Sequence, residues 1–104
     1  MGDSKKGTNR KEDVKVLDRL KRPRRYKVIL HNDNYTPRGF VVQVLEEVFQ
    51  LPAATAAGLM MLVHTTGRGV IGTYSHEIAE MKSSKTNKLA RAYNYPMTTS
   101  TEPE

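Results

Sequence analysis

Short polar side chains follow the first apolar run of the sequence, and a proline comes directly after them. Residues 31–37 read HNDNYTP, and residues 40–45, which read FVVQVL, have helical apolar spacing. Amide and carboxylate oxygens in such a segment can accept hydrogen bonds from a cation. The apolar run offers a hydrophobic surface beside them. The pattern therefore indicates a site for a small cationic group next to a hydrophobic one.

Structural roles explain the same residue types without any ligand. Asn32 and Asp33 are typical turn residues, because their side chains bond to their own backbone. His64 fits a half-buried helix face, and Met60 and Val63 have the helical spacing of ordinary core residues. Composition and spacing alone favour structure over function, and both interpretations stay open at this point.

The sequence offers little chemistry for catalysis or metal binding. Its three histidines are His31, His64 and His76, and Ser75 is better explained as a helix cap than as a nucleophile. Asp33 and His64 could pair, but such a pair alone is not a catalytic triad. The chain has no cysteine, which excludes disulfides and thiolate metal sites. We therefore predict a protein that is not an enzyme and that holds no metal and no cofactor.

The chain's 104 residues suffice for one small domain, and their charge is unevenly spread. The first 25 residues hold ten basic and four acidic side chains, whereas the rest holds seven of each. We predict a disordered charged extension over 1–22, which has few large apolar residues, and one domain over 23–104. Because acids interleave with the bases, a nucleic-acid partner is disfavoured.

No apolar run approaches the roughly 20 residues of a membrane span, and no signal segment is visible. We therefore expect a cytoplasmic protein with no membrane partner.

Hydrophobic periodicity predicts an α+β domain in the order β-α-α-β-α-β. Residues 25–30 place Tyr26, Val28 and Leu30 on one face, as in a half-buried strand. Further short strands are predicted at 70–74 and 97–101. Three short antiparallel strands would then pack on three helices around one core.

Each of the three predicted helices has a recognisable start. Thr36 is the predicted N-cap of the first, with Pro37 at its first position. The second follows Pro52 and ends at the glycines within 67–69. Ser75 caps the third. The positions of this third helix that are predicted to face inward are Ile78, Met81, Leu89 and Tyr93.

Several separate motifs together resemble the ClpS family, whose members are adaptors that deliver N-end-rule substrates to the Clp protease. The likeness runs through segments 26–37 (YKVILHNDNYTP), 59–64 (LMMLVH) and 77–82 (EIAEMK). The single residues that extend it, in matching order, are Phe40, Val41, Gly67, Gly69, Pro96 and Met97. The resemblance covers about residues 23–104, which is essentially the whole predicted domain.

The resemblance implies a module that grips the first residue of a protein when that residue is Leu, Phe, Tyr or Trp. The residues it implies around the free α-amino group are Asn32, Asp33 and His64. Those it implies in the side-chain pocket are Ile29, Arg38, Val41, Met60, Val63 and Met97, with Asn34, Thr36 and Pro37 at the rim. It also implies docking through Glu77 and Lys82 on the N-terminal domain of the unfoldase ClpA, or of the related ClpC. Residues 1–22 would approach the unfoldase pore, and we expect a monomer.

Two positions depart from the usual family pattern. Asn34 stands where a second Asp is common, and Arg38 stands where many bacterial members have Met. Arg38 could either narrow the pocket or stack on an aromatic ligand. Plastid members resemble this chain at both positions, so the plastid stroma is the alternative location. An alternative class of function is a small module that docks on the ribosome or on RNA through its basic extension.

Overall fold

Three antiparallel strands form one sheet with β1 (Arg25–His31) at its centre. The computed structural model describes residue 13 and residues 24–104, so nearly all of the predicted extension over 1–22 lies outside the described residues. Within the described part, β2 (Arg68–Ser75) pairs with one edge of β1 and β3 (Thr98–Pro103) pairs with the other. The sheet order is therefore β2-β1-β3.

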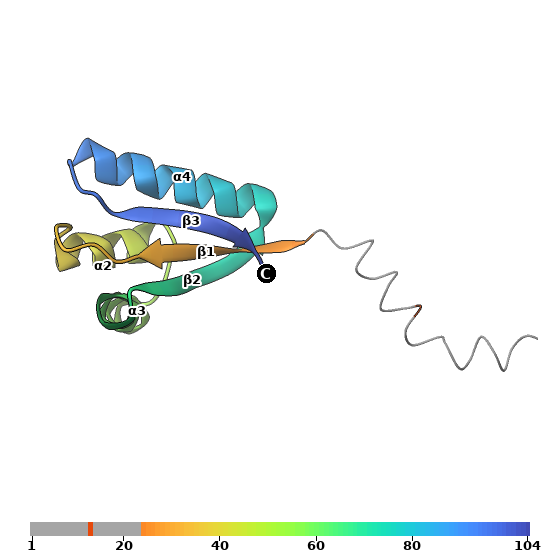
Figure 1. Cartoon of the computed structure of the whole chain (residues 1–104), viewed down its shortest axis with the longest axis horizontal. Helices are drawn as coiled ribbons and strands as arrows, with labels where there is room; N and C mark the ends of the chain where they lie inside the picture. The colour runs from red at the N-terminus through yellow and green to blue at the C-terminus, as the bar shows by residue number, and fades with distance from the viewer. Residues whose placement is uncertain (1–12, 14–23) are drawn as a thin grey trace, which may run out of the picture.

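Helices α2 (Arg38–Glu47), α3 (Ala53–Thr66) and α4 (His76–Ala92) pack on this sheet. In Figure 1, α4 runs along β3, while α3 lies beside β2 and contacts α2. The element order along the chain is β-α-α-β-α-β. The predicted α+β class and order are confirmed.

The core-facing positions of β1 are those predicted, but the opposite face is buried as well at Ile29. Val28 and Leu30 are buried in the main core, at 0% and 2% exposure. Ile29 is also buried, but its neighbours across the strands are Ser100 and Val70, which are both exposed. Since successive side chains of a strand point to opposite faces, Ile29 faces away from the side that Leu30 occupies. This difference between Ile29 and Leu30 matters for the site described below.

Helix α2 begins one residue later than predicted. Pro37 is the N-cap residue, with φ −60° and ψ 138°, and Arg38 is the first helical residue. The backbone N–H groups of Phe40 and Val41 donate to the Pro37 carbonyl, at 3.1 and 3.2 Å. No side chain caps this helix. The prediction that Thr36 is the cap is therefore wrong, because its hydroxyl group bonds elsewhere.

Gly67 ends α3, as predicted, whereas Gly69 has a different role. Gly67 has φ 97°, a left-handed conformation that favours glycine, and its N–H donates to the Val63 carbonyl at 2.8 Å. Gly69 lies within β2, where a Cβ atom would come to 2.9 Å from Val63 Cγ2 and 3.0 Å from Leu59 Cδ1. A glycine here lets α3 lie close to β2, which fixes the position of the last turn of α3, where His64 is found.

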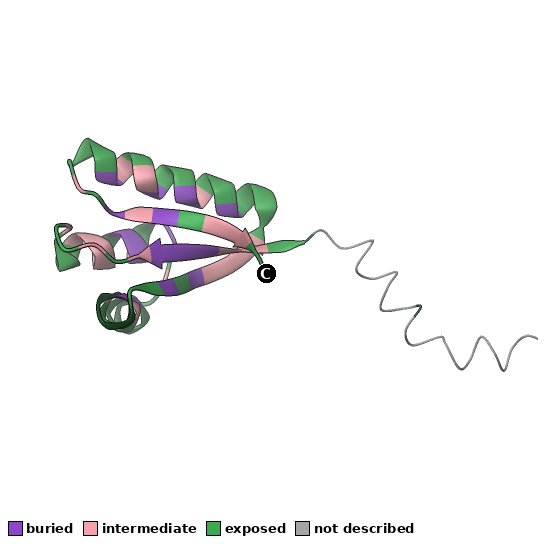
Figure 2. Ribbon diagram, viewed as in Figure 1, coloured by how far each residue is buried: buried purple, intermediate pink, exposed green. Residues whose placement is uncertain are grey.

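The buried face of α4 differs from the prediction, although its cap does not. The Ile78 N–H donates to Ser75 Oγ at 3.3 Å. The buried positions carry small side chains: Ala79, Ser83, Thr86 and Ala90. Of the four positions predicted to face inward, Ile78, Met81 and Tyr93 are exposed and only the half-buried Leu89 packs against the core. Figure 2 shows the exposed side of α4 as an almost continuous green strip.

Candidate functional site

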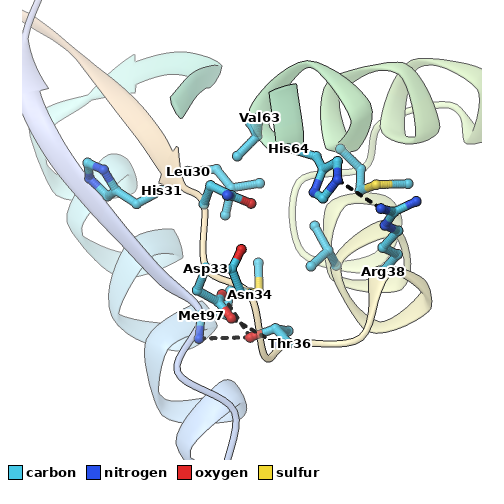
Figure 3. Close-up of a pocket in the computed structure, with 12 residues that line it drawn as sticks. Leu30, His31, Asp33, Asn34, Thr36, Arg38, Val63, His64 and Met97 are labelled. Carbon is cyan, nitrogen blue, oxygen red and sulfur yellow. Dashed lines mark hydrogen bonds between the residues drawn. The ribbon is translucent and has the colours of Figure 1, made fainter. Parts of the chain in front are cut away.

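A cavity of about 160 Å³ opens where β1 ends, among the β1–α2 loop, α2, α3 and the residue before β3. Its apolar lining residues are Leu30, Val41, Met60, Val63 and Met97, and its polar ones are His31, Asn32, Asp33, Asn34, Thr36, Arg38 and His64. In Figure 3, Asp33 and Asn34 lie on one side of the cavity, and Arg38 and His64 lie on the other. The cavity thus combines apolar walls with polar groups at its border.

Asp33 shapes the loop by accepting three hydrogen bonds. Its Oδ1 accepts from the backbone N–H of Tyr35 at 2.8 Å and of Thr36 at 2.7 Å. Its Oδ2 accepts from the Thr36 hydroxyl at 2.9 Å. This is the turn chemistry expected of Asp, and it uses most of the acceptor positions of the carboxylate. All three partners are neutral, so the negative charge of Asp33 is not cancelled within the loop.

Thr36 joins this loop to the beginning of β3. Its Oγ1 accepts a hydrogen bond from the backbone N–H of Met97 at 3.1 Å while it donates to Asp33. Met97 has no exposed surface and lines the cavity. The Thr36 hydroxyl therefore holds an apolar wall of the cavity beside a carboxylate.

Asn32 is positioned through its backbone rather than its side chain. Its N–H donates to the Gly67 carbonyl at 2.9 Å, which fastens the loop to the end of α3. The Asn32 side chain is exposed and borders the cavity, as does that of Asn34. Each amide oxygen can accept hydrogen bonds from a ligand.

His64 and Arg38 contact each other at the border of the cavity. Arg38 Nη2 lies 2.8 Å from His64 Nε2 (Figure 3). A guanidinium group can only donate hydrogen bonds, so Nε2 is the acceptor in this contact, which assigns the proton of the neutral His64 ring to Nδ1. The contact joins the first residue of α2 to the last turn of α3, and both side chains are exposed.

The structure brings together most of the residues that the sequence suggested for a binding site. Ten of them line the cavity: Asn32, Asp33, Asn34, Thr36, Arg38, Val41, Met60, Val63, His64 and Met97. Ile29 and Pro37 do not line it. Placing Ile29 in the pocket was wrong by one residue, because Leu30 has the opposite orientation on the strand and lines the cavity instead. Pro37 lies at the entry to α2, outside the lining.

Two lining residues, Leu30 and His31, are missing from the set derived from the sequence. The alternation of β1 was the signal that could have identified Leu30, which was predicted to face inward. His31 borders the cavity, but its Nε2 lies 2.6 Å from Ser100 Oγ, and Figure 3 shows its ring turned away from the other labelled side chains. His31 therefore contributes to the wall rather than to the group of ligand-facing polar atoms.

Glu77 and Lys82 lie away from the cavity, on α4. Glu77 is exposed in the first turn of the helix. Lys82 is half-buried, and its Nζ donates to the Val48 carbonyl at 2.8 Å. The same Nζ lies 5.8 Å from the ring centroid of Phe49 and 5.5 Å from that of Tyr74. Lys82 thus links α4 to the end of α2, whereas Glu77 projects into solvent.

Two further findings concern the chemistry of the described residues. Over residues 13 and 24–104, no group of three or more His, Cys, Asp or Glu side chains is arranged to hold a metal ion. None of the helices in this part of the chain is long and apolar enough to cross a membrane. The polar atoms at the cavity are hydrogen-bond donors and acceptors, which suit the binding of a partly polar, partly apolar ligand.

The fold and the site define a class of protein: a small α+β module with a mixed polar and apolar cavity at the end of its central strand. Residues 21–100 match the family model described as "ATP-dependent Clp protease adaptor protein ClpS". The chain belongs to the ClpS family of Clp protease adaptors. The matched residues include the entire cavity lining.

Individual relatives agree with this assignment. The ATP-dependent Clp protease adapter protein ClpS of Oleidesulfovibrio alaskensis is 42% identical over 102 residues, which cover 98% of each chain. The ClpS protein of Syntrophus aciditrophicus is 44% identical over 85 residues, 82% of this chain and 79% of that one. The solved structure of Agrobacterium tumefaciens ClpS2 bound to L-phenylalaninamide is similar with a TM-score of 0.78 and 41% identity. It covers 80% of this chain and 100% of that chain.

Proposed function

We propose that this adaptor binds proteins whose first residue is Leu, Phe, Tyr or Trp and delivers them to a ClpA-type unfoldase of the Clp protease. The observation that carries the proposal is the cavity, in which apolar walls adjoin the Asn32 amide and the Asp33 carboxylate. L-phenylalaninamide, the ligand of the related ClpS2, carries a free α-amino group and a benzyl side chain. These two groups have the chemistry that the two parts of the cavity would recognise.

The size of the cavity supports a single bulky side chain as its occupant. Its volume of about 160 Å³ is close to that of an engineered apolar cavity of about 150 Å³ that binds benzene. Burying a Leu- or Phe-sized side chain contributes roughly 1.5–3 kcal/mol. The thioethers of Met60 and Met97 can adapt to both aliphatic and aromatic shapes. The cavity therefore suits a first residue of either kind.

The polar border supports selection of a true N-terminus over an internal residue. An α-ammonium group donates hydrogen bonds to the Asn32 oxygen and is attracted by the Asp33 charge. Hydrogen bonds that involve a charged group contribute roughly 1.5–3 kcal/mol. An acetylated or internal residue has one amide N–H and no charge, so it would lose this contribution and leave acceptors unpaired.

The partner surface is the part of the proposal that rests on Glu77 and Lys82. We expect exposed Glu77 to contact the N-terminal domain of ClpA or ClpC, whereas Lys82 would act mainly by holding α4 on α2. A pull-down with that purified domain tests this. Glu77→Lys should no longer capture the unfoldase domain. Glu47→Lys, a change at an exposed position on α2, should still capture it. Equal capture of both variants would exclude Glu77 from the docking surface.

Peptide binding tests the recognition step directly. Fluorescence anisotropy would be measured for Leu-initiated and Phe-initiated peptides, each beside its N-acetylated twin. The proposal predicts saturable binding of the free amines, with a Kd in the micromolar range, about −8 kcal/mol, and at least tenfold weaker binding of the acetylated twins. Equal binding of both members of each pair would mean that this ClpS-family cavity does not read a free N-terminus.

A further inference from the structure

We propose that Arg38 competes with the α-ammonium group of the ligand for the acceptor nitrogen of His64, so that it lowers both the affinity for a free amine and the discrimination against an acetylated one. This inference rests on the proposed function, because it assumes an amine as the ligand. It concerns a property of this chain that follows from one contact, the 2.8 Å hydrogen bond between Arg38 Nη2 and His64 Nε2.

The donor and acceptor inventory of His64 leads to the competition. A neutral imidazole has one N–H donor and one acceptor nitrogen. In the structure, the acceptor is Nε2 and Arg38 occupies it. The remaining ring nitrogen, Nδ1, carries the proton and can only donate. His64 can therefore accept a hydrogen bond from an ammonium group only after Arg38 has left.

The other acceptors at the cavity do not replace His64 fully. Both oxygens of Asp33 accept hydrogen bonds from the loop, two on Oδ1 and one on Oδ2. Asn32 and Asn34 contribute one amide oxygen each, and Asn34 lies on the side of the cavity opposite His64 (Figure 3). An ammonium group has three donors, and His64 Nε2 is the acceptor that can reach it from the Arg38 side. The ammonium gains this acceptor at the expense of the Arg38 bond.

An acetylated N-terminus is affected differently. It offers no ammonium, so it gains nothing by displacing Arg38. If Arg38 were absent, such a ligand would cover His64 and leave Nε2 unpaired, which is unfavourable. With Arg38 present, Nε2 keeps a partner. Arg38 therefore weakens binding of the free amine. It also spares the acetylated form the cost of leaving Nε2 unpaired. Both effects reduce the factor by which the free amine binds more tightly than the acetylated form.

The first test concerns His64 in the free protein and needs no ligand. Long-range proton–nitrogen NMR of the imidazole ring distinguishes which nitrogen carries the proton. We expect a single tautomer with the proton on Nδ1 in the parent protein, and a mixture of tautomers in Arg38→Met. The same mixture in both proteins would overturn the proposal, because Arg38 would then not occupy Nε2.

The second test measures Kd for a Phe-initiated peptide and its acetylated twin. Arg38→Met should bind the free amine about two- to tenfold more tightly, the range expected of one hydrogen bond, and should raise the acetyl-to-amine Kd ratio. Arg38→Lys keeps a long side chain with a donor for His64, so its acetyl-to-amine Kd ratio should remain near the parent value. Lys88→Met, an exposed change on α4, is the control for net charge and should change neither Kd.

A double-mutant cycle separates competition for His64 from simple charge repulsion. In a His64→Ala background, Arg38→Met should no longer raise the acetyl-to-amine Kd ratio, because the acceptor nitrogen of His64 is absent. An undiminished effect of Arg38→Met in the His64→Ala background would overturn the competition and leave charge repulsion as the cause. If no variant binds either peptide while the tautomer of His64 is fixed, the proposed function itself fails and the Arg38–His64 contact is structural only.

Discussion

The hydroxyl group of Thr36 connects the carboxylate of Asp33 to the backbone of Met97, a residue 61 positions further along the chain. It donates to Asp33 Oδ2 at 2.9 Å and accepts from the Met97 N–H at 3.1 Å. One hydroxyl group thus fixes the relative position of the loop after β1 and the residue before β3. These two segments supply the charged and the apolar parts of the cavity.

Thr36→Val should destabilise the protein by about 1–3 kcal/mol, because it leaves the buried Met97 N–H unpaired. Valine has nearly the shape of threonine, so packing changes little. Thr36→Ser keeps the hydroxyl group, so its free energy of unfolding should fall by less than half as much as that of Thr36→Val. Urea unfolding of both variants measures the difference. Equal stability of Thr36→Val and the parent would show that the hydroxyl bridge does not hold these segments together.

Replacements of Asp33 can separate its charge from its turn-forming role. Asp33→Asn keeps an oxygen that can accept from the Tyr35 and Thr36 N–H groups but removes the charge. Asp33→Ala removes both. We expect Asp33→Asn to weaken binding of a Phe-initiated peptide about tenfold with little loss of stability, and Asp33→Ala to cost a further 1–2 kcal/mol or so of folding free energy. Parent-like peptide affinity in Asp33→Asn would exclude the carboxylate charge from ligand binding.

Lys82 is expected to stabilise the fold through the end of α2. Its Nζ donates to the Val48 carbonyl, where a cation also interacts favourably with the helix dipole. Lys82→Met keeps an apolar stem and removes the ammonium group, so it should destabilise the protein by about 1 kcal/mol. Lys85→Met, on the exposed face of the same helix, should be neutral in thermal unfolding. Identical melting temperatures for the two variants would contradict this role.

Tyr74 should make stability fall at alkaline pH. Burial raises the pKa of the Tyr74 hydroxyl above its ordinary value of 10.0, because the charged form is poorly solvated there. The unfolded chain therefore loses this proton at a lower pH than the folded chain. Stability is unaffected below the unfolded pKa and decreases as pH rises above it. Tyr74→Phe should show a shallower loss of stability above about pH 10, and an unchanged pH profile would refute the assignment.

Patterns that depend on neighbouring residues predicted the fold well. The core-facing positions of β1, the glycine at the end of α3 and the Ser75 cap of α4 are local features, and the structure has all three. The grouping of loop polar residues with Met60, Val63 and His64 could not follow from spacing alone, since it depends on the close approach of α3 to β2 at Gly69. The family resemblance supplied that grouping.

The inward face of α4 shows where hydrophobic patterning fails. The apolar positions Ile78 and Met81 point to solvent, while the small residues Ala79 and Ser83 are buried. Close packing of a helix on a sheet favours small side chains, and Ser83 is compensated by a 2.7 Å hydrogen bond with Thr99. A scale that ranks residues by hydropathy gives no weight to either effect.

The hydroxyl of Thr36 was misassigned for a related reason. A Thr before Pro is a common helix start, so local rules favour a cap. Its real partners are Asp33, three residues away, and Met97, in a distant segment. Only the tertiary structure brings Met97 within reach.

The most direct test of the central claim is an NMR titration of the labelled protein with L-phenylalaninamide and with N-acetyl-L-phenylalaninamide. The free amine is expected to shift the amide signals of Asn32, Asp33, His64 and Met97, which line the cavity. The acetylated form should leave these signals nearly unchanged at the same concentration. Equal shifts with both compounds, or shifts confined to residues outside the cavity, would contradict recognition of a free N-terminal residue at this site.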